Sequence, residues 1–127
     1  MERINLSDGE WKLMNRLWRE PPKTITQLTE ELKDETGWGK NSIITMLNRL
    51  EAKGAVYHEE GGRAKRFFPA VLKEDTALKE TKGFLERVYD GSLSMMVNAM
   101  VSSKTLSKKD IEELYHILER AEEEEHG

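Results

Sequence analysis

The chain has 127 residues, a net charge of −4 at pH 7, 37% hydrophobic residues and no cysteine. This length suits one ordinary domain or two small ones that share a core, and the absence of cysteine excludes a disulfide framework and a thiolate metal site. No apolar run approaches the roughly 18 residues of a membrane-spanning helix, so we expect a cytoplasmic protein with no membrane partner.

Two short helices are predicted at the start of the chain. Ser7 and Glu10 have the spacing of a capping box, so the first helix should begin after Ser7, and Pro21–Pro22 should end it. Thr24–Gln27 repeats the capping-box spacing, and a turn at Thr36–Gly37 should end the second helix. The apolar residues expected in the core are Trp11, Leu13, Met14, Leu17 and Trp18 in the first helix and Ile25, Leu28 and Leu32 in the second.

A third helix is predicted over Trp38–Gly54, and its two faces differ in chemistry. One face is apolar at i, i+3, i+4 and i+7 (Ile43, Met46, Leu47 and Leu50), and Gly54 is placed to cap the end. The other face is uncharged or cationic, with side chains of the types that bond base edges and phosphates in a DNA major groove. A helix face that is merely solvated is the alternative. The second face comprises Asn41, Thr45, Asn48, Arg49 and Ala52, with Ser42 on its border.

A β-hairpin is predicted directly after this helix. Ala55–Glu59 and Lys65–Pro69 are short runs with β-branched or aromatic residues, and Gly61–Gly62 between them permits a tight turn. A hairpin with a cationic tip after a polar-faced helix is typical of a winged helix-turn-helix that holds the DNA backbone, whereas an ordinary surface hairpin is the alternative. We expect Asn41, Ser42, Thr45 and Arg49 to read base edges and Lys40, Arg63, Lys65 and Arg66 to hold phosphates.

The charge is distributed unevenly along the chain. Residues 1–70 carry a net charge of +1 and residues 71–127 a net charge of −5. Because charged contacts act within about a Debye length, roughly 10 Å, a locally basic surface can serve DNA although the whole chain is acidic. We therefore predict a mainly α fold, with an α+β winged helix-turn-helix domain for DNA binding over residues 1–70.

Residues 71–127 are predicted to form a region of three helices that dimerises. Val71–Tyr89 is compatible with a helix that Asp90–Gly91 breaks, an apolar segment follows over 93–101, and a last helix starts after Ser107. Three slender amphipathic helices bury little within one chain, so a second copy should cover them; the alternative is a monomer in which they fold back on residues 1–70. The expected dimer interface comprises Leu93, Met96, Val97, Met100, Ile111, Leu114, Tyr115 and Leu118.

Two other classes of function are considered. The apolar C-terminal helices favour a protein-interaction module built on a winged-helix scaffold as the second hypothesis. An enzyme is not expected, because no nucleophile-base-acid trio, phosphate-binding loop or metal-ligand spacing is present. His58, His116 and His126 fall in three unrelated segments and are expected to be solvated, so neither a metal nor a cofactor is predicted.

Short motifs in a shared order over about 110 residues resemble the penicillinase and methicillin-resistance repressor family (BlaI/MecI). The resembling pieces are Leu6–Asp8 with Glu10 and Trp18; Trp38 with Ile43 and Thr45–Leu50; Lys53–Ala55; Gly62–Arg63; Phe84–Leu85 with Tyr89–Leu93; and Asp110–Ile111 with Glu113–Tyr115 and Ile117–Glu119.

The resemblance implies a homodimeric winged-helix repressor that occupies a pseudo-palindromic operator and blocks transcription of resistance or related genes. It also implies that six residues lie at or near the DNA, namely Trp38, Asn41, Ser42, Thr45, Arg49 and Arg63. Asn41 and Ser42 occupy positions where family members often carry Lys and Thr, so the base preference of these two residues is open.

The resemblance further implies a proteolytic switch. In characterised members, a sensor-controlled protease cuts an Asn–Phe bond inside the middle dimerisation helix. The aligned bond here is Ala99–Met100, next to Asn98. A different protease, a different cut and the absence of such a switch are therefore all open. A related branch senses copper through a cysteine-rich tail, which the absence of cysteine excludes.

Overall fold

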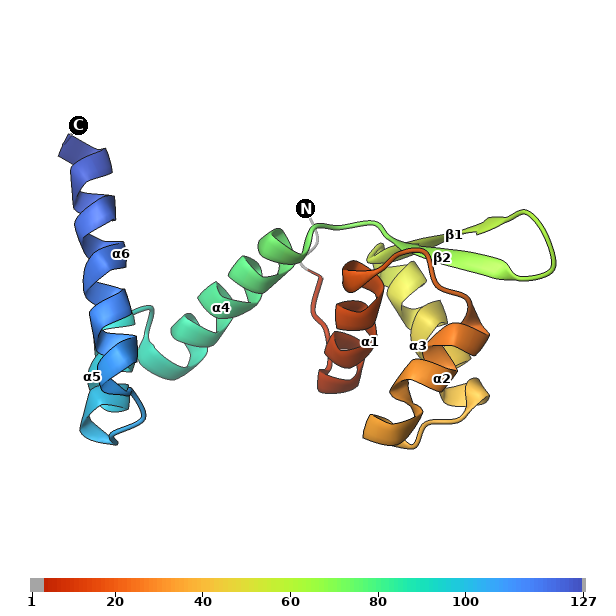
Figure 1. Ribbon diagram of the computed structural model, residues 1–127, viewed down its shortest axis with the longest axis horizontal. Helices are drawn as coiled ribbons and strands as arrows, with labels where there is room; N and C mark the ends of the chain where they lie inside the picture. The colour runs from red at the N-terminus through yellow and green to blue at the C-terminus, as the bar shows by residue number, and fades with distance from the viewer. Residues whose placement is uncertain (1–3, 127) are drawn as a thin grey trace. The chain divides into compact units, whose positions relative to one another are not determined.

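The computed structural model describes residues 4–126, and the chain divides into two compact units between Glu80 and Thr81. The first unit contains three helices, a two-stranded sheet and the beginning of a fourth helix (Figure 1). Its elements are α1 (Asp8–Arg19), α2 (Ile25–Thr36), α3 (Lys40–Lys53), β1 (Val56–Glu60), β2 (Lys65–Pro69) and the first part of α4 (Lys73–Tyr89). The second unit contains the rest of α4, α5 (Leu93–Ser102) and α6 (Lys108–His126).

The ends of the first helices are set by the capping residues that the sequence predicts. Ser7 and Glu10 form a reciprocal capping box at the start of α1, and Thr24 and Gln27 do the same at α2. Gly37 follows α2 in the left-handed region, with φ 70°, where a side chain would be strained. These caps confirm the predicted helix starts.

Two predicted helices begin later than expected. The sequence predicts a third helix from Trp38, but α3 starts at Lys40 and Gly39 is its N-cap. The helix expected from Val71 starts at Lys73. The reason for the second difference is tertiary: the Val71 carbonyl oxygen accepts a hydrogen bond from Trp18 Nε1 at 2.9 Å, and Val71 packs against the core. These contacts hold Val71 in the connection between β2 and α4.

The core of the first unit lies between α1, α2, α3 and the sheet. The apolar stripes of the three helices and the inner face of the hairpin meet there, as their spacing predicts. No expected core residue of the third helix lies on the surface, although Met46 is only half-buried. The buried apolar residues are Leu6, Leu13, Met14, Leu17, Leu28, Leu32, Ile43, Leu47, Leu50, Ala55, Val56 and Phe67.

β1 and β2 form an antiparallel hairpin in which Val56 lies opposite Pro69 and Glu60 opposite Lys65. Lys23 adds a third, one-residue strand, since its N–H donates to the Phe67 carbonyl oxygen at 3.1 Å and its carbonyl oxygen accepts from the Phe67 N–H at 2.8 Å. The Lys23 ammonium is buried and lies 2.7 Å from Glu31, whose carboxylate raises the pKa of Lys23. Three helices followed by this hairpin confirm the predicted winged helix-turn-helix.

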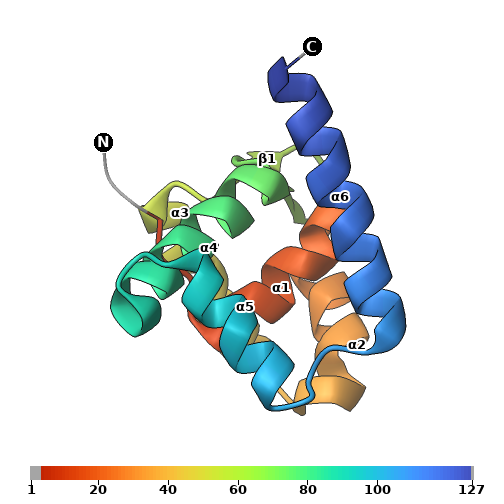
Figure 2. The same ribbon diagram turned by 90° about the vertical axis from the view of Figure 1, so that its left-hand side faces the viewer.

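The second unit presents apolar side chains without burying them. The loop over residues 103–107 joins α5 to α6, which diverge from it in Figure 2. Ser92 caps α5, and hydrogen bonds from Ser107 to Asp110 at the start of α6 lower the pKa of that carboxyl. No residue of α5 is buried within one chain. Within residues 4–126, no helix is both long and apolar enough to cross a bilayer.

Candidate nucleic-acid interface

The predicted base-reading residues share one exposed face of α3. Asn41, Ser42, Thr45 and Arg49 are all exposed, and they line a shallow hollow together with Met46. Lys40 is exposed at the start of the same helix. A row of amide, hydroxyl and guanidinium groups on an exposed helix face has the chemistry that binds base edges in a major groove. The structure therefore brings the four predicted base-reading residues together, with Lys40 at the start of the same helix.

Two features of α3 define what this face offers. The Thr45 hydroxyl donates to the Asn41 carbonyl oxygen at 3.0 Å, so its methyl group and oxygen lone pairs are presented outward. Gly39, the N-cap, supplies no side-chain hydrogen bond. The Ser42 N–H donates to the Gly39 carbonyl oxygen at 3.1 Å, so within the described part of the chain the N–H groups of Lys40 and Asn41 are the ones available to an outside acceptor such as a phosphate.

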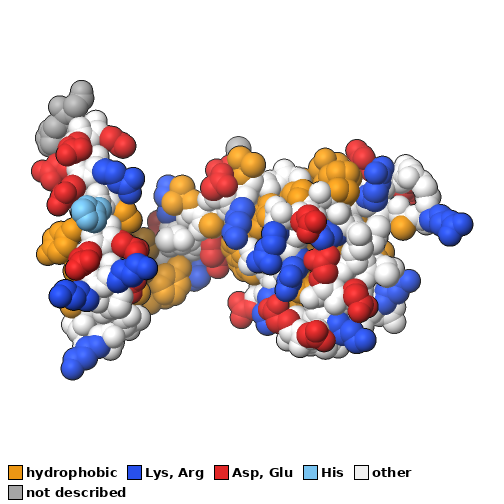
Figure 3. Space-filling view, viewed as in Figure 1, with side chains coloured by type: hydrophobic (Ala, Val, Ile, Leu, Met, Phe, Trp, Pro, Cys, Tyr) orange, Lys and Arg blue, Asp and Glu red, His pale blue; other side chains and the backbone are white. Residues whose placement is uncertain are grey.

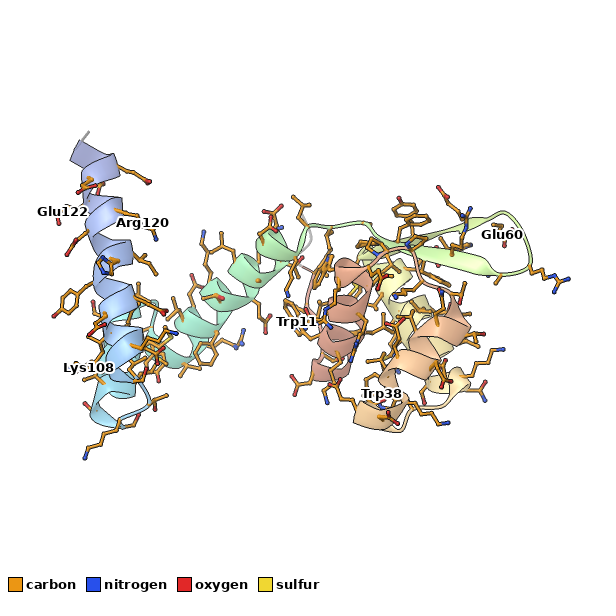
Figure 4. The ribbon with its side chains drawn as sticks, in the orientation of Figure 1. Trp11, Trp38, Glu60, Lys108, Arg120 and Glu122 are labelled. Atoms are coloured by element: carbon orange, nitrogen blue, oxygen red, sulfur yellow. The ribbon has the colours of Figure 1, made fainter. Side chains whose placement is uncertain are left out.

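Trp38 lies beside this face and has a structural role that its sequence position does not reveal. Its side chain is half-buried, and an added Cβ on Gly9 would lie 3.2 Å from the Trp38 ring. The ring therefore packs closely over the start of α1, where the methyl group of Met46 also lies. Figure 4 labels Trp38. This contact holds the beginning of α3 against α1, while contact of Trp38 with DNA stays a prediction.

The other end of α3 is held by an ion pair between an exposed lysine and a buried glutamate. Lys53 Nζ lies 2.6 Å from the Glu10 carboxylate and 2.7 Å from the Asn5 carbonyl oxygen. Glu10 is only 2% exposed. Burial raises the pKa of Glu10, but the hydrogen bonds from Lys53 and Ser7 outweigh it and hold the pKa below the usual 4.5. α3 is thus fixed to α1 at both ends.

This ion pair predicts a loss of stability in acid. A carboxyl whose pKa is lowered by folding contributes stability that is complete above its unfolded pKa and disappears as the pH falls through the folded one. We expect Glu10→Gln to lower the unfolding free energy by about 1–3 kcal/mol at neutral pH and to weaken its decline below about pH 4.5. Urea unfolding at several pH values measures both; an equally steep acid decline in the variant would contradict the assignment.

The tip of the hairpin carries the other predicted phosphate ligands. Arg63, Lys65 and Arg66 are exposed, and Figure 3 shows Lys or Arg side chains at the end of the hairpin. Arg66 lies 3.9 Å from Glu59, its partner across the strands. Neither Arg63 nor Lys65 forms an ion pair within residues 4–126, so both can bind a phosphate without giving one up.

His58 differs from the prediction of a solvated side chain. It is half-buried on β1, with Nδ1 2.7 Å from Glu51 Oε2 and its ring 5.5 Å from that of Phe67. Sequence spacing gives no signal for this contact, because a strand and a helix meet through a turn. Among residues 4–126, no three His, Cys, Asp or Glu side chains lie close enough to hold a metal ion.

The predicted dimer residues line an apolar groove in the second unit. The groove measures about 640 Å³ and runs between α5 and α6. Six predicted interface residues line it, whereas Ile111 and Tyr115 are exposed on α6 outside it. In the segment aligned with the family cleavage site, Ala99 is exposed and Met100 half-buried. The six lining residues are Leu93, Met96, Val97, Met100, Leu114 and Leu118.

The chain resembles known repressors over most of its length. Residues 6–120 match the penicillinase repressor family. The chain is 34% identical to the penicillinase repressor of Bacillus licheniformis, over 90% of this chain and 89% of that protein. It is 29% identical to the methicillin resistance regulatory protein MecI of Staphylococcus aureus, over 91% and 94%. Its fold resembles monomeric Bacillus licheniformis BlaI in complex with the blaP half-operator, with 30% identity and a TM-score of 0.52 over 58% of this chain and 90% of that one.

Proposed function

The chain belongs to the penicillinase repressor family, and we propose that it represses transcription by occupying a pseudo-palindromic operator as a homodimer. The observation that carries this proposal is the exposed polar face of α3 beside a hairpin with a cationic tip, within one compact unit. The solved structure of BlaI on a half-operator matches 58% of this chain, which supports the proposal. Binding requires no chemistry, so occupancy alone blocks transcription.

The contacts divide into two classes. Arg49 and the polar groups of Asn41, Ser42 and Thr45 read base edges, because they share one exposed face of α3. The contacts to the DNA phosphate backbone fix the position of the protein on the duplex without reading its sequence. Those contacts come from Lys40, Arg63, Lys65 and Arg66, and Trp38 lies at or near the DNA.

Homodimerisation uses the apolar groove of the second unit. Leu118 is 62% exposed and Tyr115 64% exposed within a single chain, which is unusual for large apolar side chains gathered on one surface. A second copy would bury them through an isologous contact. A two-fold dimer would also place two α3 helices on successive half-sites of one operator.

The regulated genes are proposed to be of the resistance type, as the names of the relatives suggest. We also propose that a sensor-controlled protease cuts the Ala99–Met100 bond and thereby releases the repressor from its operator. This bond lies within α5, so cleavage requires α5 to open locally first. The absence of buried residues in α5 lowers the cost of that opening.

A protein-interaction module remains the second candidate, because the groove between α5 and α6 is apolar and exposed in one chain. The two candidates differ in what covers this surface. Sedimentation equilibrium separates them: a stable homodimer uses the surface, whereas a monomer leaves it for another protein.

The direct test of the repressor is fluorescence anisotropy with DNA from upstream of its own gene and a scrambled duplex, over about 50–300 mM salt. We expect tight, sequence-selective binding of two chains per site that weakens steeply with salt. Equally weak binding to both duplexes would favour the interaction module.

A further inference from the structure

The hairpin is tied to α3 by the contact between Glu51 and His58. Glu51 lies in the last turn of α3 and His58 in the middle of β1, and their side chains meet at 2.7 Å. The His58 ring also packs against Phe67 on β2 at an angle of 46°. The half-buried His58 side chain, itself on β1, thus contacts both α3 and β2.

Beyond this contact the hairpin has no described support from a helix. The next two cross-strand pairs, Glu59 with Arg66 and Glu60 with Lys65, are exposed and face only each other. Among the hydrogen bonds and ion pairs of residues 4–126, the Glu51–His58 contact is the outermost that joins the hairpin to a helix. This contact therefore sets the direction in which the unsupported tip of the hairpin extends from α3.

Because the tip is far from His58, a small change in the angle of the hairpin moves the tip by a large distance. β1 ends at Glu60, two residues beyond His58, which is about 7 Å at roughly 3.4 Å per strand residue, and the turn that holds Arg63 extends a few ångström farther. The tip therefore lies about 10 Å from His58. A tilt of about 10° at His58 would move the tip by about 2 Å, which exceeds the tolerance of a hydrogen-bonded ion pair. Phosphate contact by Arg63 thus depends on the angle that the contact fixes.

We propose that Glu51 and His58 are positioning residues that hold the hairpin at the angle where Arg63 binds the DNA backbone while α3 occupies the major groove. The inference rests on the proposed function, because it takes Arg63 as a phosphate ligand. Neither Glu51 nor His58 contacts DNA in this arrangement. Both act through the hairpin.

A thermodynamic cycle on operator binding tests the positioning role. Glu51→Ala and His58→Phe each remove the contact, and phenylalanine keeps a ring against Phe67. Each is expected to weaken binding about fivefold in the natural chain but less than about twofold in an Arg63→Ala background. Each should also make the plot of log affinity against log salt shallower by about 0.9, the value for one lost phosphate contact.

Glu10→Gln supplies the matched control, because Glu10 holds the same last turn of α3 to α1 rather than to the hairpin. Its effect should be equal with and without Arg63, and thermal unfolding verifies that every variant is folded. If Glu51→Ala and His58→Phe lose as much affinity in the Arg63→Ala background as in the natural chain, the positioning role is wrong. Unchanged affinity and salt slope in Arg63→Ala alone would overturn the phosphate contact and the positioning role together.

Discussion

Leu118→Asp is expected to convert the protein to a monomer and to weaken binding to a full operator by about 100-fold or more, since linked half-sites gain that much from bivalency. Leu118 is 62% exposed within one chain and lines the groove between α5 and α6. An aspartate there remains solvated in the monomer, so the single chain should stay folded. In the dimer the same carboxylate would be buried without a partner, which is strongly unfavourable.

Sedimentation equilibrium and anisotropy with full and half operators measure this prediction. The variant should bind a half operator as the natural chain does, because the first unit is untouched. Arg120→Asp is the matched control: it places the same carboxylate on α6 about 200° around the helix, away from the groove. Equal dissociation of both variants would indicate a nonspecific charge effect, and a dimeric Leu118→Asp protein would place the interface elsewhere.

The local features of the first unit are predictable because short-range rules determine them. A capping box spans three residues and a helical stripe repeats every 3.6, so Ser7, Thr24 and the core leucines can be read from the sequence directly. The polar face of α3 emerges from the same periodicity. These local features are sufficient to predict that the proposed base-reading residues share one exposed face of α3, where the structure also has them.

The contacts that orient α3 are not predictable in this way. Lys53 and Glu10 are 43 residues apart, and Trp38 meets Gly9 from a different segment of the chain. The Glu51–His58 contact spans only seven residues, but it depends on how the turn at Gly54 folds back. Such contacts follow from tertiary packing, to which no local period corresponds.

Arg49→Ala is expected to weaken operator binding by about 1–3 kcal/mol with little effect on scrambled DNA. Arg49 is exposed in the middle of α3 and lines the same hollow as Asn41 and Thr45. No ion pair of Arg49 is recorded within residues 4–126. Its guanidinium is therefore free to form two parallel hydrogen bonds with one guanine, a geometry that a single ammonium cannot reproduce.

Two further substitutions separate base reading from charge. Arg49→Lys keeps the positive charge, so it should retain the salt dependence yet lose most of the selectivity. Arg63→Ala should instead weaken operator and scrambled DNA alike and reduce the salt slope by about one. Anisotropy with both duplexes over the same salt series distinguishes these outcomes. Equal losses on both duplexes for Arg49→Ala and Arg63→Ala would mean that α3 holds the backbone and that sequence is read by another part of the chain.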